Sequence, residues 1–341
     1  MERRRDTRIR DVAERAQVSV GTVSNVLNGS TRVSPAIRER VQAAIAELGY
    51  VRNEAARQLR AGRSSMVGLV VLDIGNPFFT DVARGAEAAG SDAGVHVMLA
   101  GSDERPDREL AYLDMFESQR VRGVLISPVG DIDERLADLR AAGIPVVLVD
   151  RASASGRLSS VSVDDVAGGR MAAEHLLGLG RRRLAFVGGP AGLQQVEERR
   201  EGAAAAVAEH PDARLETIAT RGLTVLEGRR VGQELVARAA GERPDAVFAA
   251  NDLVAVGLLQ ALVMSGAARV PDEIALVGYD DIDFAAAAVV PLSSVRQPSE
   301  RIGSSALRLL LDEAEEPGIA PRQVRFRPEL VVRASTGGAG D

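Results

Sequence analysis

The chain has 341 residues, a formal net charge of −6 and no cysteine, and 45% of its residues are apolar. This length accommodates a small domain and two larger ones, and the lack of cysteine excludes disulfide bonds and thiolate metal sites. The three histidines show no ligand spacing, and no apolar run reaches the ~20 residues of a membrane-spanning helix. We therefore expect no metal, no cofactor and no membrane association, and the basic, polar N-terminus is unlike a signal peptide. The basic residues are all arginine and alanine and glycine are abundant, which indicates GC-rich coding, so we expect a prokaryotic cytoplasmic protein.

Three short helices are predicted within the first fifty residues. Apolar residues recur at helical spacing over residues 9–16, and a three-residue turn follows. Ser19 is a suitable N-cap for a second helix over residues 20–27, and a third helix, capped by Ser34, ends at Gly49. A small helical bundle that binds no nucleic acid has the same periodicity, so this alternative stays open at this point.

The second helix is predicted to bury Val23, Val26 and Leu27 and to present small residues outward. The residues predicted to point away from the core are Val20, Gly21, Thr22, Ser24 and Asn25. Two short helices joined by a tight turn, with small polar residues near the start of the second, form the layout that enters a DNA major groove.

Charge is distributed unevenly along the chain. Residues 1–63 contain thirteen arginines and seven acidic residues, a net charge of +6, so the remainder carries −12 within the total of −6. A basic head on an acidic body predicts that only the head binds a polyanion such as DNA.

The head resembles the DNA-binding headpiece of the LacI/GalR family of transcription regulators. The resemblance is carried by Asp11–Ala13, Val18–Asn28, Val33-Ser34, Leu48–Tyr50, Asn53 and Ala55–Leu59, and it continues through the rest of the chain. It implies an all-α helix-turn-helix headpiece over residues 1–52, a hinge helix and linker over 53–65, and an effector-binding and dimerisation core over 66–341.

The family pattern assigns DNA contacts residue by residue. Val20, Gly21 and Asn25 match its principal base-contacting positions, and most of the others touch phosphates. The implied DNA-binding residues are Arg10, Ser19, Val20, Gly21, Thr22, Ser24, Asn25, Asn28, Arg32, Ser34, Asn53, Ala56, Arg57 and Leu59. Gly21 has no side chain to read a base, and Asn25 stands where many members have arginine, so the base read at that step stays open.

Residues 53–60 are too few to form a stable helix in water by themselves. In the family this segment folds on DNA, pairs with its twin and inserts a leucine into the minor groove; Leu59 stands at that position. The alternative for this segment is an ordinary interdomain linker.

From residue 66 onward, apolar strands alternate with amphipathic helices, a pattern typical of parallel sheets covered on both faces. Strands are predicted at residues 67–72, 95–100, 121–127, 145–150, 184–188, 214–219, 246–250, 274–278 and 293–297, and helices at 80–93, 108–119, 166–177, 200–209, 226–239, 253–264 and 299–312. This number of strand–helix units is too large for one compact sheet, so we predict an α/β core of two lobes. The resemblance implies that these lobes are periplasmic-binding-protein-like. The implied first lobe covers about residues 66–161 and 294–324, and the second about 163–291 and 326–334.

Ligands of such sheets collect at the carboxyl ends of the strands, where this chain places polar and aromatic side chains. The predicted effector-binding residues are Asn76, Phe78, Phe79, Asp150, Arg151, Arg199, Asn251, Asp280 and Gln297. Rings suit the apolar face of a sugar, and carboxylate, amide and guanidinium groups suit its hydroxyls.

For each of these residues, a purely structural role is the alternative to effector binding. Asn76 and Asp252 are plausible helix caps, and the phenylalanines are plausible core residues. Arg199 and Gly202 match an arginine-x-x-glycine that the family places just after a strand. Leu223 stands where sugar-binding relatives often have an aromatic residue, which leaves the size of the effector open.

Signatures of enzymes are absent from the sequence, which has no Gly-x-Ser-x-Gly elbow, Walker loop or HExxH motif. We therefore predict a homodimeric transcriptional repressor that works on the nucleoid and binds double-stranded operator DNA. Its allosteric effector is predicted to be a monosaccharide or a derivative.

Two alternatives remain: a regulator of the same family that responds to a purine or another metabolite, and a sugar-binding protein that does not act on DNA. The sequence leaves open the effector's identity, its action as inducer or corepressor, the operator, the regulated genes, and repression versus activation.

Overall fold

The computed structural model describes residues 7–27, 33–50 and 64–338. The chain divides into two compact units, Met1–Arg63 and Ser64–Asp341, called here the head and the core. Several residues predicted to bind DNA lie outside the described residues, namely Asn28, Arg32, Asn53, Ala56, Arg57 and Leu59. Within the described part of the chain, no helix has the length and apolar character needed to cross a membrane.

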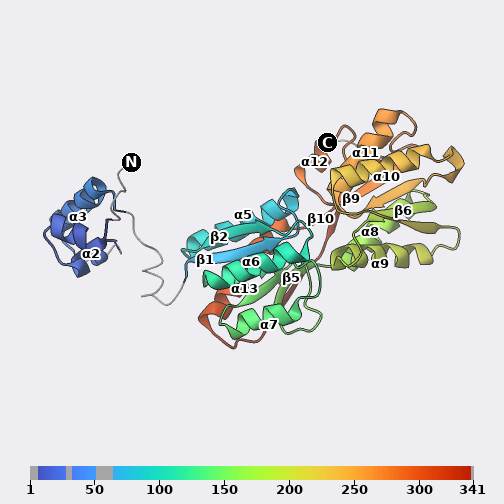
Figure 1. Cartoon of the computed structure of the whole chain (residues 1–341). Helices are drawn as coiled ribbons and strands as arrows, with labels where there is room; N and C mark the ends of the chain where they lie inside the picture. Colours follow the sequence, from blue (N-terminus) through green and yellow to red (C-terminus); the bar gives the residue numbers. More distant parts are fainter. Residues whose placement is uncertain (1–6, 28–32, 51–63, 339–341) are drawn as a thin grey trace. The chain divides into compact units, whose positions relative to one another are not determined.

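The head contains the three predicted helices, α1 (Ile9–Arg15), α2 (Val20–Leu27) and α3 (Pro35–Leu48) (Figure 1). Their small apolar core consists of Val12, Ala13, Ala16, Val23, Val26, Val41 and Ala44. Arg40 on α3 donates a hydrogen bond of 2.5 Å to the carbonyl oxygen of Ala16, so the third helix fixes the turn between the first two.

The core is built on two sheets of six strands each. The first sheet has the order β11-β5-β4-β3-β1-β2, with β1 (Met66–Val71), β2 (His96–Gly101), β3 (Gly123–Ile126), β4 (Val146–Val149), β5 (Ser159–Val163) and β11 (Gln323–Phe326). The second has the order β12-β10-β9-β8-β6-β7, with β6 (Arg183–Gly188), β7 (Arg214–Ala219), β8 (Ala246–Ala249), β9 (Ala275–Asp280), β10 (Ser293–Arg296) and β12 (Glu329–Val331). Among the described strands, neighbours run parallel except β10 and β12, so the predicted α/β fold class is confirmed.

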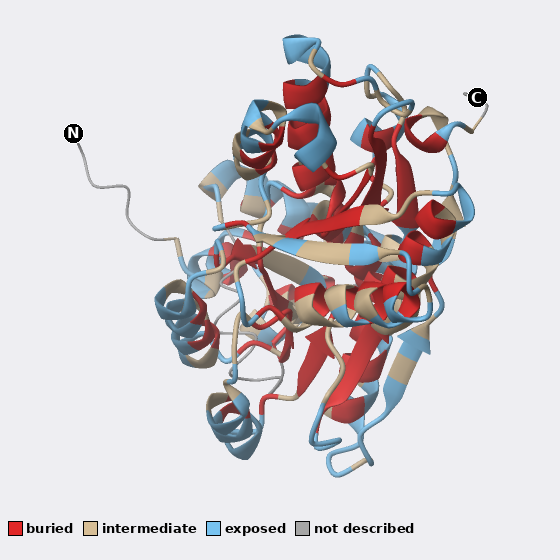
Figure 2. Cartoon of the chain, turned by 90° about the vertical axis from the view of Figure 1, so that its right-hand side faces the viewer, coloured by how far each residue is buried: buried red, intermediate tan, exposed pale blue. Residues whose placement is uncertain are grey.

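Helices cover both faces of each sheet (Figure 1). The first sheet lies between α5 (Pro77–Asp92) with α13 (Ser299–Glu315) and α6 (Pro106–Ser118) with α7 (Asp133–Ala141). The second lies between α8 (Asp165–Gly178) with α9 (Gln194–Ala208) and α10 (Val225–Ala237) with α11 (Asp252–Ser265); the short α12 (Asp283–Ala286) follows β9. Alternate strand residues face opposite layers: Leu69 packs with α5, and Val70 with α6. Figure 2 shows the resulting concentration of buried residues in the strands.

Glycines set the distance between α8 and α9. A Cβ added to Gly169 would lie 1.9 Å from the carbonyl oxygen of Arg199, and one added to Gly202 would lie 1.9 Å from that of Val166. Only glycine allows the two backbones to approach so closely. The helix that carries Arg199 is therefore held directly against its neighbour.

Three segments connect the lobes. The chain leaves the first sheet after Val163, returns after Arg296 and crosses again between Phe326 and Glu329. Each crossover comes a few residues later than the sequence predicted, because β5, β10 and β11 each complete their pairing before the chain changes lobe. The end of β10 consequently brings Gln297 to the same sheet edge as the end of β9.

Candidate DNA-binding helix and effector pocket

The start of α2 is fixed by Ser19, as predicted. Its Oγ accepts the backbone N–H of Thr22 at 3.1 Å and lies 2.9 Å from Thr22 Oγ1. Gly21 and Asn25 are exposed and lie four residues apart, hence on one side of the helix. This is the side that the sequence assigned to base contacts, and Arg10 on α1 is exposed as well.

Two details of the head differ from the prediction. Val20 is half-buried and packs against the head's apolar core instead of pointing away from it, because its isopropyl group extends the apolar stripe of Val23 and Leu27. Ser34 precedes α3 and is exposed, but its hydroxyl forms no capping hydrogen bond; Pro35, which lacks an N–H, begins the helix. Thr22 and Ser24 are half-buried.

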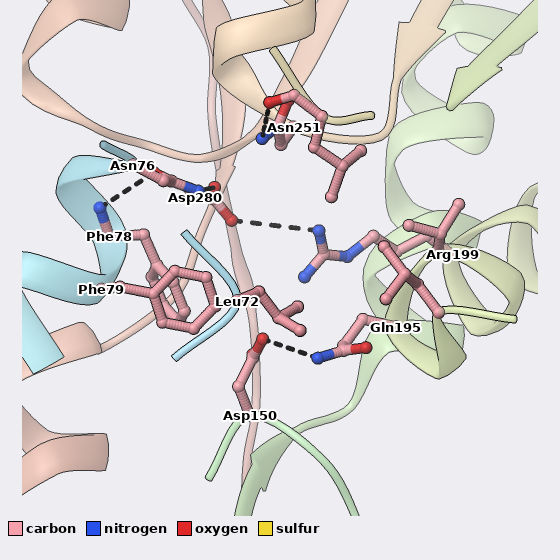
Figure 3. Close-up of a pocket in the computed structure, with 12 residues that line it drawn as sticks. Leu72, Asn76, Phe78, Phe79, Asp150, Gln195, Arg199, Asn251 and Asp280 are labelled. Atoms are coloured by element: carbon pink, nitrogen blue, oxygen red, sulfur yellow. Dashed lines mark hydrogen bonds and ion pairs between the residues drawn. The ribbon is translucent and has the colours of Figure 1, made fainter. Parts of the chain in front are cut away.

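A small cavity lies between the two lobes of the core (Figure 3). The first lobe contributes Leu72, Asn76, Phe78, Phe79 and Asp150, and the second contributes Leu193, Gln195, Val196, Arg199, Leu223, Asn251 and Asp280. All the predicted effector-binding residues except Arg151 and Gln297 line it.

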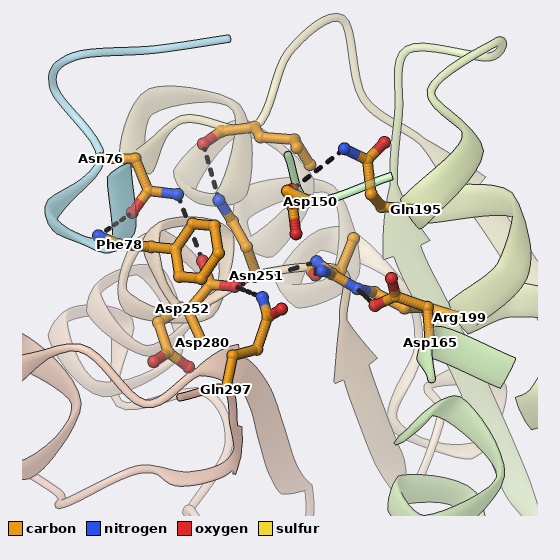
Figure 4. A network of polar contacts seen from close by, with 12 residues as sticks. Asn76, Phe78, Asp150, Asp165, Gln195, Arg199, Asn251, Asp252, Asp280 and Gln297 are labelled. Atoms are coloured by element: carbon orange, nitrogen blue, oxygen red, sulfur yellow. Dashed lines mark hydrogen bonds and ion pairs between the residues drawn. The ribbon is translucent and has the colours of Figure 1, made fainter. Parts of the chain in front are cut away.

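Asn76 and Asp280 connect the lobes on one side of the cavity (Figure 4). Asn76 caps α5, since its Oδ1 accepts the N–H of Phe78 at 3.0 Å, and its Nδ2 donates to Asp280 Oδ2 at 3.2 Å. Gln297 donates from Nε2 to the other carboxylate oxygen of Asp280 at 2.8 Å. The capping role of Asn76 therefore orients its amide toward the second lobe.

Gln195 and Asp150 connect the lobes on the other side. Gln195 donates from Nε2 to Asp150 Oδ2 at 2.9 Å. The sequence reasoning missed Gln195 because it placed the start of this helix at Arg200, whereas α9 begins at Gln194. Arg199 accordingly lies within the helix and not just after a strand. Gln195 precedes Arg199 by one helical turn, and that spacing is the signal that could have identified it.

Arg199 is the buried cation of the site. Its Nε lies 2.7 Å from Asp165 Oδ1, and its Nη1 donates to the carbonyl oxygen of Ala250 at 2.8 Å and lies 3.9 Å from Asp280 Oδ1. The guanidinium carbon is 3.7 Å from the centre of the Tyr279 ring. Burial alone would lower the pKa of Arg199, but Asp165, Tyr279 and Asp280 raise it, so the side chain stays charged.

Asn251 positions one wall of the cavity. It caps α11 by accepting a backbone N–H of the first turn, and its Nδ2 donates to the carbonyl oxygen of Leu223 at 3.2 Å. The expectation that Asp252 caps this helix is wrong. Asp252 is buried and instead accepts hydrogen bonds from the N–H of Ile282 and from Ser294 Oγ, because the turn after β9 lies above it.

The remaining predicted residues have distinct positions. Phe78 and Phe79 are buried, line the cavity and contact each other edge to face, with ring centres 5.0 Å apart. Arg151 donates to the carbonyl oxygen of Gly130 at 2.6 Å and is not part of the lining. Gln297 reaches the site only through Asp280.

The polar groups of the cavity have spare hydrogen-bond acceptors. Burial raises the pKa of Asp280 to about 6, against the opposing effects of Arg199 and two amides. Burial also raises the pKa of Asp150 well above its ordinary value, and the charge of Asp165 adds to this. Among the described residues, no donor reaches Asp150 Oδ1 or Gln195 Oε1, although both atoms are buried. Unpaired buried acceptors cost about 1–3 kcal/mol each, so the cavity favours a ligand rich in donors.

The two units of the chain match two family models. Residues 8–53 match the model of bacterial regulatory proteins of the lacI family, and residues 173–336 match that of a periplasmic binding protein-like domain. The chain is 38% identical to the transcriptional regulator CelR of Thermobifida fusca, over 98% of this chain and 100% of that protein. It is 34% identical to the ribose operon repressor of Halalkalibacterium halodurans, over 97% and 98% of the two chains.

Solved structures show the same relationship. A complex of CelR with cellobiose matches with a TM-score of 0.71 at 34% identity, over 96% of this chain and 99% of that chain. The lac repressor dimer bound to operator and the anti-inducer ONPF matches with a TM-score of 0.83 at 26% identity, over 97% and 99%. The chain therefore belongs to the LacI family, as a DNA-binding transcriptional regulator and not an enzyme.

Proposed function

We propose that this regulator is a homodimeric repressor whose affinity for a palindromic operator is controlled by a sugar bound between the lobes. The observation that carries the effector class is the cavity itself, where buried acceptors and two phenyl rings converge from different strand ends. Sugar hydroxyls supply donors for Asp150 and Gln195, and a ring covers an apolar sugar face. A purine has fewer donors than a sugar to offer these acceptors.

Two of the relatives support this class of effector. The CelR structure contains cellobiose, and the ribose operon repressor is named for ribose. A monosaccharide or a close derivative suits the polar and aromatic groups that line the cavity. A protein that binds operator DNA works where the chromosome is, so we place this regulator in the cytoplasm with the nucleoid.

Effector binding is coupled to DNA through the lobes. Because both lobes supply contacts, a bound sugar favours their closed arrangement and shifts the first lobes of a dimer relative to each other. A hinge segment that folds only beside its twin is a two-state element that such a shift biases. We expect release of DNA on sugar binding, with a coupling free energy of roughly 1–3 kcal/mol.

Asp150→Asn is expected to weaken sugar binding by roughly tenfold or more, because an NH₂ group replaces a carboxylate oxygen that a hydroxyl would donate to. Asparagine tolerates the left-handed backbone at this position, where φ is 58°. Calorimetry with a panel that includes ribose, glucose and cellobiose measures the change. The control is Asp107→Asn, which alters an exposed ion pair with Arg105 on the surface of the first lobe.

The calorimetry has two outcomes that contradict the proposal. If a sugar binds Asp150→Asn and the wild type equally well, the assigned pocket is wrong. If no sugar of the panel binds the wild type, the effector belongs to another chemical class.

Leu59→Ala is expected to lower specific operator affinity and DNA bending while leaving sugar binding unchanged. The role of Leu59 as a minor-groove wedge follows from the family resemblance, since this residue lies outside the described part of the chain. An inserted apolar wedge kinks the duplex, so its removal should reduce the bend. Mobility-shift assays on circularly permuted fragments measure bending, and the neighbouring Gln58→Ala is the control. Unchanged bending would return residues 53–60 to the status of a linker.

A further inference from the structure

Glu104 forms a contact between the lobes outside the cavity lining. It follows β2 in a tight turn in which φ is 52° at Asp103 and 57° at Glu104. Its backbone N–H donates to the carbonyl oxygen of Leu72 at 3.2 Å in the first lobe, and its Oε1 accepts the N–H of Leu223 at 3.4 Å from the second. Leu72 and Leu223 both line the cavity. Glu104 thus joins the two cavity walls directly behind their lining residues.

Leu223, the residue that Glu104 contacts, is also hydrogen-bonded to a residue that lines the cavity. The carbonyl oxygen of Leu223 accepts a hydrogen bond from Asn251 Nδ2, while its N–H points to Glu104. The next residue in this wall, Gly222, lies against the same carboxylate, since a Cβ there would be 3.4 Å from Glu104 Oε2. The position of this wall therefore depends on a pocket residue on one side and on Glu104 on the other.

The Glu104 carboxyl lies in an environment that disfavours its charge. It is half-buried, and none of the ion pairs formed by the described residues includes it. Burial raises the pKa of Glu104 to about 7; the N–H of Leu223 opposes this, and the nearby Asp73 and Asp103 add to it. On the second lobe the charged groups of the adjoining turn are Arg221 and Glu227, and the backbone N–H of Arg221 donates to Glu227 at 3.0 Å.

Separation of the lobes would remove the Leu223 contact and expose the Glu104 carboxyl, which would shift its pKa back toward the ordinary value of 4.5. The closed form therefore binds more protons than the open form between pH 4.5 and about 7. Below this pH range Glu104 is protonated in both forms and does not oppose closure. As the pH rises through the range, the free-energy cost of closing the lobes over an ionised Glu104 grows. Acid should favour closure, and alkali should oppose it.

We propose that Glu104 is a positioning residue that acts as a proton-sensitive clasp between the lobes. When protonated it favours closure of the Leu223 side of the cavity over the effector, and when ionised it opposes this closure. The effector itself rests on the proposed function above, whereas the clasp is a property of the chain alone. It makes lobe closure, and through it operator binding, responsive to pH near neutrality.

Energy transfer between the lobes tests the clasp in the full-length protein without any sugar. Because the chain has no cysteine, dyes can be attached to Glu134→Cys on the first lobe and Glu201→Cys on the second, with excess unlabelled chain present. The closed fraction is expected to rise from pH 8 to pH 5. The closing equilibrium of the wild type should change about tenfold more than that of Glu104→Gln, allowing for solvent screening of a half-buried group.

A matched control separates the effect of protonating Glu104 from the effects of other titrating groups. Asp150 and Asp280 also lie between the lobes and titrate in both proteins, so the difference between the wild type and Glu104→Gln isolates Glu104. Glu109 accepts the N–H of Val129 at 2.8 Å, the same type of contact but within the first lobe. Glu109→Gln should keep the wild-type pH profile. A Glu104→Gln profile that matches the wild type overturns the proposal.

Hydrogen exchange tests the contact itself. Exchange of the Leu223 amide should become faster in Glu104→Ala and stay slow in Glu104→Gln, which keeps an acceptor oxygen. Unchanged exchange in Glu104→Ala would show that the clasp does not form. Neither experiment needs a ligand, so a failure of every sugar to bind would refute the proposed effector class and leave the clasp standing.

Discussion

Arg199→Met is expected to lower the free energy of unfolding of the core by about 3–5 kcal/mol at pH 8, because it leaves buried carboxylates without their cation. Arg199 and Asp165 have only 4% and 3% of their side chains exposed, so water cannot replace the lost partner. Methionine keeps most of the volume and removes the charge. Urea denaturation followed by circular dichroism measures the change.

The loss should depend on pH in a defined direction. Arg199 lowers the pKa of Asp280, so without it this pKa rises further above the ordinary value of 3.8. A carboxyl whose pKa is raised in the folded state destabilises the fold increasingly as the pH rises through that pKa. The defect of Arg199→Met should therefore be larger at pH 8 than at pH 5.

The adjacent arginine provides a control on the same helix. Arg200 is 41% exposed and pairs with Glu197 one turn away, and such surface pairs contribute about 0–1 kcal/mol. Arg200→Met should therefore change stability little at either pH. Equal losses in the two variants would show that the buried charge network does not stabilise the core as described.

Gly202→Ala is expected to destabilise the core by about 2–3 kcal/mol through overpacking. The added methyl group would lie 1.9 Å from the carbonyl oxygen of Val166, and both partners are backbone, so α8 and α9 must move apart. Since α9 carries Gln195 and Arg199 into the cavity, sugar affinity should fall as well. Thermal unfolding and calorimetry measure the two effects.

Gly178 near the end of α8 is the matched control. Its added Cβ would meet nothing within 4 Å. Gly178→Ala should stabilise the protein by up to about 1 kcal/mol, since alanine has the higher helix propensity. If Gly202→Ala were equally harmless, the close approach of the two helices would not determine the geometry of the site.

Local sequence signals determined the head and most of the core. Caps and helical spacing define α1, α2 and α3, and short apolar runs between helices define β1 and β8. Asn76, Asp150, Asn251 and Asp280 could be assigned to one site because parallel strands bring their carboxyl ends to one edge. These features depend on neighbours in sequence or on a general rule of α/β topology.

Tertiary structure alone decided the features whose hydrogen-bond partners are remote in the chain. The serine-rich strand β5 is buried because Ser159 and Ser160 donate to Glu313 and Gln323, both at 2.5 Å. No local pattern shows that these hydroxyls find such partners, so the strand does not read as apolar. A buried polar group is stable only when paired, and the pairing is set by long-range topology.

The contacts between the lobes are also set by long-range topology. Gln195 reads as the polar first turn of a helix, and Glu104 as part of a charged surface turn. Gln195 becomes part of a site only because the fold brings Asp150 to it, and Glu104 only because the fold brings Leu223 to it. The sequence by itself determined most of the elements, the family and the chemistry of the strand ends. The approach of the lobes decided which polar groups pair, because hydrogen bonds act over about 3 Å and depend on geometry that only the folded chain supplies.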